Sequence, residues 1–449
     1  MKSVDPVNDT HLRAVGTVDA GVVAEVGPDG NVTFADGSPP LRWFVAADDR
    51  WHDPAVDAAV RQSRVDGAPV FETRLRIPGG DIVQRVWAVV GRDTGREIDR
   101  SLRTRVVCDF ENDSRLPVAI ALTRRGLAVS RPLAARGGSG EWPAPGLDLP
   151  EPPVVIPIGH QSRVRVVITP GFSAAVDGTA VVEALPDDIV EPEAVVRGWT
   201  QLTERASHLS LDDVLDTRPI SERVTGERAA IALEPPPNMF AGGDALVAAH
   251  WLLDVREATR LKVESYESSE IATAAEVLLR GGRAVERGLF AASVRAAAEL
   301  LAPDERAMRD LSRAVTGSRR AALYEFLGND RLVVSGSLAR GAFTTALEES
   351  LVMPTGDDTI TFLPDGCPAE RLGTNFEVSG VGIGRGRTVS FAVRWHGGNA
   401  AILWEVTGTT KVDMRCGADL SWTSSSMAGE GLWRIEDFRP KVSTDLSFS

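Results

Sequence analysis

The stretch Thr388–Val406, TVSFAVRWHGGNAAILWEV, decides the fold of the C-terminal part of the chain. Apolar residues occupy every second position of its first half: Val389, Phe391, Val393 and Trp395. This period of two is typical of a strand with one buried face. His396–Asn399 then supplies a short turn with two glycines, and Ala401–Val406 is apolar enough to be the returning strand. The stretch therefore predicts an antiparallel hairpin in a C-terminal β-domain, with its register fixed by the apolar side chains.

Residues 15–200 contain repeated pairs of strand-like runs separated by short polar turns. The turns are Gly27–Gly30, Pro78–Gly80, Asn112–Arg115 and Gly159–Ser162. Each pair is predicted to be a hairpin with one apolar face, and such faces must be covered. Two stacked antiparallel sheets would cover them. The sequence therefore predicts an N-terminal antiparallel β-sandwich.

The pattern changes near Glu191, where apolar residues begin to recur at spacings of three and four. Helices are predicted over Val195–Ala206, Asp244–Val255, Ser268–Arg280, Arg283–Leu301, Asp304–Val315, Ser318–Leu327 and Ser337–Leu351. Asp304 is a predicted N-cap. The predicted fold class is multidomain α+β, with an N-terminal β-sandwich (1–200), a central all-α domain (201–335) and a C-terminal antiparallel β-domain (336–449).

Composition limits the possible functions. The net charge of −14 disfavours nucleic acid and anionic membranes as partners, because both require a basic surface. The N-terminus lacks an apolar leader and no run is long enough to span a membrane, so a cytoplasmic location is expected. The three cysteines, Cys108, Cys367 and Cys416, have no CxxC spacing. We therefore expect no disulfide framework, no metal site and no cofactor.

Four segments of the C-terminal part together resemble a known family. They are FLPDGCPAERLG (362–373), FEVSG (376–380), RTVSFAVRWHGG (387–398) and AAILWEV (400–406). This run is similar to the C-terminal β-domain of bacterial six-hairpin (α/α-toroid) glycosidase-like proteins. The resemblance implies a carbohydrate-associated protein whose central helices form a partial toroid, because the predicted helices suffice for only about half of a ring.

Glycoside hydrolysis requires two carboxyl groups on either side of the scissile bond, and the resemblance places them in the helical domain. The candidate catalytic residues are Asp254 and Glu267; the candidate substrate-binding residues are Trp251, Glu264, Tyr266 and Trp51. An aromatic ring beside a carboxylate suits a sugar, which has both C–H faces and hydroxyl groups. The alternative is that these acids are solvated residues of amphipathic helices and that Trp251 belongs to the core.

One departure from the family lowers the expectation of activity. Members that look active carry a stretch such as DGHDGWA ahead of the C-terminal domain. Here the corresponding segment, SGSLARGAFTTALEESLV (335–352), has no such cluster. We therefore expect reduced or lost hydrolase activity, with an oligosaccharide as a possible ligand. The alternative is a non-enzymatic scaffold or protein-binding subunit. Under either hypothesis, a homodimer or partner chain is expected to cover the shortened helical domain.

Spaced glycines at Gly380–Gly386 raise a further hypothesis, a dinucleotide-binding loop. Such a loop joins a strand to a helix. Here the predicted element after the glycines is another strand, so the sequence context excludes this interpretation.

Overall fold

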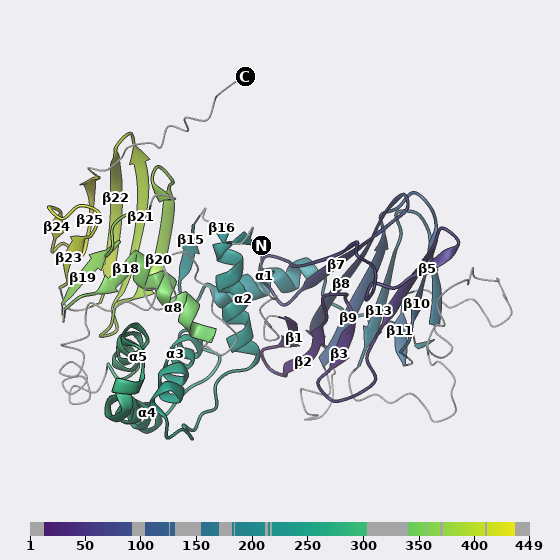
Figure 1. Ribbon diagram of the computed structural model, residues 1–449, viewed down its shortest axis with the longest axis horizontal. Helices are drawn as coiled ribbons and strands as arrows, with labels where there is room; N and C mark the ends of the chain where they lie inside the picture. Colours follow the sequence, from purple (N-terminus) through teal and green to yellow (C-terminus); the bar gives the residue numbers. More distant parts are fainter. Residues whose placement is uncertain are drawn as a thin grey trace. The chain divides into compact units, whose positions relative to one another are not determined.

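The computed structural model describes residues 13–91, 104–124, 126–130, 154–169, 182–183, 185–211, 214–215, 218–302, 340–356, 358–368, 371–408 and 411–435 (Figure 1). The chain divides into two compact units, residues 1–202 with 232–234, and residues 203–231 with 235–449. The division lies close to the predicted boundary at residue 200. The helices and the C-terminal strands, which are predicted to be separate domains, belong to the same unit and share one hydrophobic core.

Two sheets of described strands lie mainly in the C-terminal part of the second unit and are drawn green to yellow in Figure 1, apart from one teal edge strand that comes from earlier in the chain. The five-stranded sheet has the order β15 (His208–Ser210), β20 (Phe376–Gly382), β21 (Thr388–His396), β22 (Asn399–Thr407) and β25 (Ala428–Arg434). The four-stranded sheet has the order β18 (Val352–Pro354), β19 (Thr359–Phe362), β23 (Asp413–Cys416) and β24 (Thr423–Ser424). Phe362 of β19 packs edge-on against Phe391 of β21, with ring centroids 4.9 Å apart. Aromatic packing therefore joins the two sheets.

The predicted hairpin is confirmed. His396 pairs with Asn399, so Gly397 and Gly398 form the two-residue loop, and Val389, Phe391 and Val393 are buried. The strand β15 was not predicted. It lies in a segment predicted to belong to the helical domain, yet Leu209 pairs with Val378 at the edge of the C-terminal sheet.

The described helices of the second unit are α2 (Ile220–Leu233, whose last residues belong to the first unit), α3 (Ala245–Leu261), α4 (Ser268–Gly281), α5 (Arg287–Leu300) and α8 (Arg340–Leu351), with a 3₁₀ turn, η3, at Gly282–Ala284. A two-stranded sheet, β16 (Val214–Leu215) and β17 (Arg218–Pro219), precedes α2. The helix α3 packs against α4, α5 and α8, and Asp244 caps it by accepting from the amides of Leu246 and Val247.

Five predicted helices have observed counterparts: Val195–Ala206 corresponds to α1 (Pro192–Thr203) of the first unit, and the other four correspond to α3, α4, α5 and α8. The helix α2 was not predicted, because its apolar residues are not confined to one face. The helices predicted over 304–315 and 318–327, and the Asp304 cap, lie outside the described residues. The partial toroid therefore stays a prediction. No helix in the described ranges is long and apolar enough to cross a membrane.

Three sheets form the first unit. The largest has the order β14 (Val182–Glu183), β11 (Leu127–Val129), β13 (Arg163–Ile168), β9 (Thr104–Asn112), β8 (Gly80–Val90), β7 (Phe71–Ile77) and β6 (Val60–Arg64). The others are β12 (Val154–Ile158), β10 (Val118–Leu122), β4 (Trp43–Ala47) and β5 (Arg50–His52), and β1 (Ala14–Thr17), β2 (Gly21–Val26) and β3 (Val32–Phe34). One core includes residues of all three, with Trp43 and Phe110 rings 5.6 Å apart. The helix α1 (Pro192–Thr203) follows these sheets. The predicted N-terminal β-sandwich is confirmed.

Two of the four predicted N-terminal hairpins are confirmed, β2–β3 and β7–β8. The other two are wrong, because β9 and β10 lie in different sheets, as do β12 and β13. The buried Asn112 explains both connections. Its Nδ2 donates to the carbonyls of Leu116 (2.8 Å), Ile158 (3.3 Å) and Gly159 (3.2 Å), and its Oδ1 accepts from Ser114. One side chain therefore holds both crossings from sheet to sheet.

We predict that Asn112→Ala destabilises the first unit by about 1–3 kcal/mol, because it leaves carbonyl groups inside the unit without their donor. Asp113→Ala, an exposed neighbour in the same turn, is the matched control and is expected to change stability by less than about 0.5 kcal/mol. Urea unfolding followed by circular dichroism measures both. Equal stabilities of the two variants would contradict the role of Asn112.

Candidate functional site

Trp51, the candidate in the first unit, is a buried residue of β5. It packs in a small cluster with Phe44, Ala46, Ala119 and Ala121. The next residue, His52, is also buried, and its Nδ1 lies 3.3 Å from Asp57 Oδ2. Trp51 therefore contributes its ring to packing on this sheet.

Trp251 and Tyr266 lie in one aromatic cluster of the second unit. The Trp251 ring is 5.3 Å from Phe240 and 5.9 Å from Tyr266 between centroids. The Trp251 indole N–H donates to the carbonyl of Pro237 at 3.0 Å, and the Tyr266 hydroxyl donates to that of Pro236 at 3.0 Å. Burial raises the pKa of the Tyr266 phenol, and Glu264 adds to this shift. Both rings thus fasten the proline-rich segment to α3.

The predicted acids have different surroundings. Asp254 accepts from the amide of Gly341 at 2.8 Å, at the start of α8. Burial raises the pKa of Asp254, against the opposing effect of Arg340. Glu267 is exposed at the N-cap position of α4, and Glu264 accepts from the amide of Ser265 at 3.0 Å. Asp254 therefore acts as a bonded partner of the α8 terminus.

An open groove contains two of the predicted residues, Glu264 and Tyr266. Its described lining is Thr259, Lys262, Val263, Glu264, Ser265, Tyr266, Ser268, Ile271 and Leu300. Asp254, Glu267 and Trp251 are not in that lining. Glu264 is the one acidic residue in this described lining, so the lining contains no pair of carboxylates.

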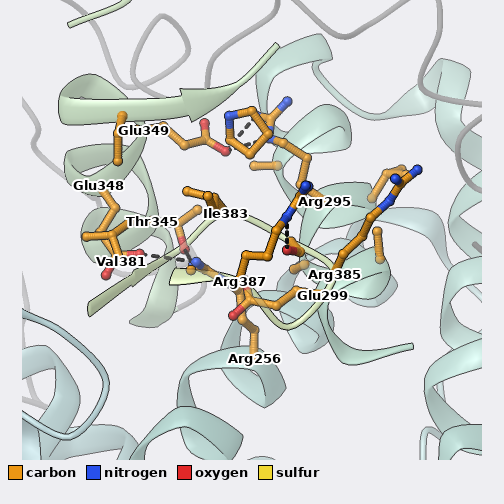
Figure 2. A pocket seen from close by; sticks show the side chains of 18 of the residues that line it. Arg256, Arg295, Glu299, Thr345, Glu348, Glu349, Val381, Ile383, Arg385 and Arg387 are labelled. Carbon is orange, nitrogen blue, oxygen red and sulfur yellow. Dashed lines mark hydrogen bonds and ion pairs between the residues drawn. The ribbon is translucent and has the colours of Figure 1, made fainter. Parts of the chain in front are cut away.

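A second cavity, of about 120 Å³, was not predicted from the sequence (Figure 2). Its wall is formed by α5, α8, β18, the end of β20 and the turn before β21, together with Arg256 of α3. The charged and hydroxyl residues in the wall are Arg256, Arg295, Glu299, Thr345, Glu348, Glu349, Arg385 and Arg387. Alanine, valine, isoleucine, proline and glycine residues complete it. The cavity therefore combines many hydrogen-bonding groups with apolar surface.

The deepest polar group of this wall is the Glu348 carboxylate, which three arginines surround. Its oxygens lie 3.3 Å from Arg228, 3.1 Å from Arg256 and 2.9 Å from Arg260. Arg228 also binds Glu257 at 2.6 Å. Arg256 also binds Glu299 at 2.7 Å and donates to the Thr345 hydroxyl at 3.2 Å. We call Arg228, Arg256, Arg260, Glu257, Glu299 and Glu348 the buried ion network.

Electrostatics decide what Glu348 can do. Burial alone would raise the pKa of Glu348, but Arg260, Arg256 and Arg228 together lower it far below its ordinary value. A carboxyl group that stays ionised cannot donate a proton to a leaving group. Glu349 is likewise bound to Arg295 at 2.6 Å. These two acids are therefore suited to accept hydrogen bonds.

The glycine-containing turn before β21 shapes the other side of the cavity. A Cβ atom on Gly382 would lie 2.6 Å from Glu299 Oε1, so a larger residue at this position would require the Glu299 side chain to move. Gly384, Arg385 and Gly386 all have positive φ, at 83°, 55° and 67°. This is the glycine run that the sequence context excluded as a dinucleotide loop.

One sequence signal could have located this cavity. Arg256, Glu257 and Arg260 interrupt an otherwise apolar face of α3, which is unusual unless charges are paired inside. The burial of Glu348 and Glu349 on α8 has no such signal in the sequence.

Comparison of the chain with protein-family models, curated proteins and solved structures finds no match. Across the part of the chain that the structure describes, no group of three His, Cys, Asp or Glu side chains is arranged to hold a metal ion.

We predict that Glu348→Gln destabilises the second unit by about 3–5 kcal/mol, because it leaves buried arginines without their shared anion. Glu377→Gln is the matched control, since Glu377 and Arg394 form an exposed pair at 3.2 Å, and it is expected to cost at most about 1 kcal/mol. Chemical denaturation of the two variants provides the measurement. A Glu348→Gln protein as stable as the control would show that the network is not a source of stability.

The same carboxylate predicts a pH dependence. The folded-state pKa of Glu348 lies below the unfolded value, so the unfolded state binds more protons between the two and stability falls as pH falls. We expect the stability difference between the wild type and Glu348→Gln to narrow as the pH drops below the ordinary carboxyl value of 4.5. Denaturation at a series of pH values tests this; a constant difference would contradict it.

Proposed function

We propose that the second unit is a non-catalytic binding module, and that it takes a small polyhydroxylated molecule of the size of one sugar ring into the cavity beside the buried ion network. The observation that carries the proposal is the wall itself, in which arginine donors and ionised carboxylate acceptors lie next to apolar surface. The proposal keeps the carbohydrate association expected from the sequence and assigns it to residues that the sequence did not indicate.

Size supports a ligand of one ring. An engineered protein cavity of about 150 Å³ binds benzene, and the cavity here has a similar volume of about 120 Å³. A longer oligosaccharide would have to leave most of its residues outside. We therefore propose that any oligosaccharide binds through a terminal unit.

The chemistry of the wall also supports a hydroxyl-rich ligand. A hydroxyl group can donate to a carboxylate and accept from a guanidinium, so neighbouring Arg and Glu side chains suit adjacent hydroxyls. Glu349 and Arg295 provide such a pair. Val381 and Ile383 provide apolar contacts for the C–H surface of a ring. The described lining residues include no aromatic side chain, so the proposed binding does not involve stacking of the sugar ring on an aromatic ring.

The proposal excludes hydrolysis at this cavity because of the state of its acids. Hydrolysis requires one protonated carboxyl group as general acid. Glu348 has a strongly lowered pKa, and an arginine holds Glu349. Reduced or lost hydrolase activity is thus proposed to follow from the arginines that keep Glu348 ionised and from the ion pair that Glu349 forms with Arg295.

A panel of neutral monosaccharides and sugar acids tests the proposal by thermal denaturation. A ligand present at 100 times its Kd is expected to stabilise the protein by about 2.7 kcal/mol. Ala298→Phe, which places a ring in the cavity wall, should abolish this stabilisation. Ala272→Phe, at an exposed position of α4, should retain it. Both variants should melt close to the wild type without ligand.

Three results would contradict the proposal. If no compound stabilises the wild type, or if Ala298→Phe responds like Ala272→Phe, the cavity is not the binding site. Release of reducing sugar from glycosides by the wild type, lost in Glu348→Gln, would show that the module is catalytic.

One observation favours a second candidate function, that of a protein-binding scaffold. Met239, Leu246 and Val247 are 74%, 45% and 51% exposed around the start of α3, and an added Cβ on Gly242 would touch both Phe240 and Val247. Adjacent exposed apolar side chains of this kind mark interaction surfaces. A homodimer or partner chain that covers the helices is proposed to bind there.

Light scattering coupled to size exclusion tests this candidate. We predict a dimer for the wild type and a monomer for Val247→Glu, because a charge at this position opposes burial of the surface. Thr273→Glu, at an exposed site on α4, is the control and should stay dimeric. A monomeric wild type would contradict self-association.

A further inference from the structure

The mouth of the cavity has a backbone feature that the proposed function does not use. Arg385 stands between Gly384 and Gly386 with φ at 55°, in the left-handed region that residues other than glycine rarely adopt. Such conformations persist only where the surrounding structure imposes them, and they cluster at ligand-binding positions. Here the turn is closed by hydrogen bonds from the amide of Ile383 to Arg387 O (3.0 Å) and from the amide of Arg387 to Gly384 O (3.1 Å).

Two guanidinium groups converge at this turn on a single carboxylate oxygen. Asp358 Oδ1 accepts from Arg385 Nη1 at 3.0 Å and from Arg387 Nη1 at 2.9 Å. Figure 2 shows both arginines among the residues lining the cavity. The two differ in exposure, since the Arg387 side chain is buried whereas that of Arg385 is 38% exposed.

The Asp358 carboxylate is a replaceable partner. Its side chain is 53% exposed, so its ion pair with the partly exposed Arg385 is screened by water and contributes little to stability. A guanidinium has five N–H donors in a planar fork that fits carboxylate and phosphate groups. An incoming anion that binds both Arg385 and Arg387 could therefore take the place of Asp358 while keeping the buried Arg387 guanidinium paired.

The deeper acids do not oppose an anion at this position. Glu299 and Glu348 are bound by Arg256 and its neighbours within the buried ion network, and Glu349 by Arg295. Their negative charge is therefore compensated locally. At the mouth, the guanidinium groups of Arg385 and Arg387 both bind the exposed carboxylate of Asp358.

We propose that the ligand of this cavity carries an anionic oxygen group, a carboxylate or a phosphate, which binds Arg385 and Arg387 by displacing Asp358. This inference rests on the proposed function, because it concerns the same cavity, and it specifies the ligand as an acidic small molecule of one ring. Asp358 is an internal competitor that occupies the arginines until the ligand arrives. The deeper part of the cavity binds the hydroxyl groups.

Isothermal titration of the whole chain with glucose, glucuronate, glucose 6-phosphate and inorganic phosphate tests the inference. At least one anionic sugar is expected to bind about tenfold or more tightly than glucose, a difference of about 1.4 kcal/mol. The comparison of glucuronate with glucose 6-phosphate shows whether the cavity prefers a carboxylate or a phosphate group. Affinity for the anion should also fall as salt concentration rises, because the mouth is partly exposed.

Three variants locate the effect. Arg385→Gln should remove the preference for the anionic sugar while leaving the affinity for glucose unchanged within about twofold. Asp358→Asn should strengthen anion binding several-fold, because the competing carboxylate is gone. Arg394→Gln, which breaks an exposed ion pair elsewhere on β21, is the matched control and should change neither affinity. A purely structural role of Arg385 would alter melting without altering the preference.

The possible failures are distinguishable. If glucose binds as tightly as the anionic sugars and Arg385→Gln has no effect on their ratio, the inference is overturned and the proposed function stands. If Asp358→Asn weakens anion binding, Asp358 is not a competitor and the displacement is wrong. If none of the four probes binds the wild type, both the inference and the proposed function fail.

Discussion

The second unit depends on the attraction between Glu348 and the three arginines around it. These groups come from α2, α3 and α8, so one carboxylate ties together helices that are far apart in the sequence. Placing such charges in a protein interior costs several kcal/mol for each ion, and the cost is offset only when every partner is in place. The network is therefore stable only in one arrangement of these helices. The same arrangement fixes the positions of the side chains that line the neighbouring cavity.

The same attraction explains the chemical character of the cavity. Arginines that hold Glu348 ionised make it a hydrogen-bond acceptor, and Arg256 also forms an ion pair with Glu299. An ionised Glu348 cannot act as a general acid, in keeping with the proposed binding function. Gly382 at the end of β20 complements this, since a side chain at that position would displace the Glu299 carboxylate from its present place.

The sequence predicted those elements whose pattern lies within a few neighbouring residues. It failed where residues far apart in the sequence determine the structure. The β21–β22 hairpin follows from the alternation of apolar residues and from the two glycines of its turn. The path after Asn112 could not be predicted, because a short polar turn serves a hairpin and a crossing between sheets equally well. The cavity was missed for a related reason: Glu348 and Glu349 look like surface acids until Arg256 and Arg295 are placed beside them.

The short strand β15 has a practical consequence for dividing the chain. It covers the edge of β20 with residues that precede all the helices after α1, through the pairing of Leu209 with Val378. A fragment that starts at α3 would leave that backbone edge open, and open edges recruit strands from other molecules. The smallest piece suited to recombinant production of this unit therefore begins before His208, well upstream of the point at which the helical sequence pattern becomes continuous.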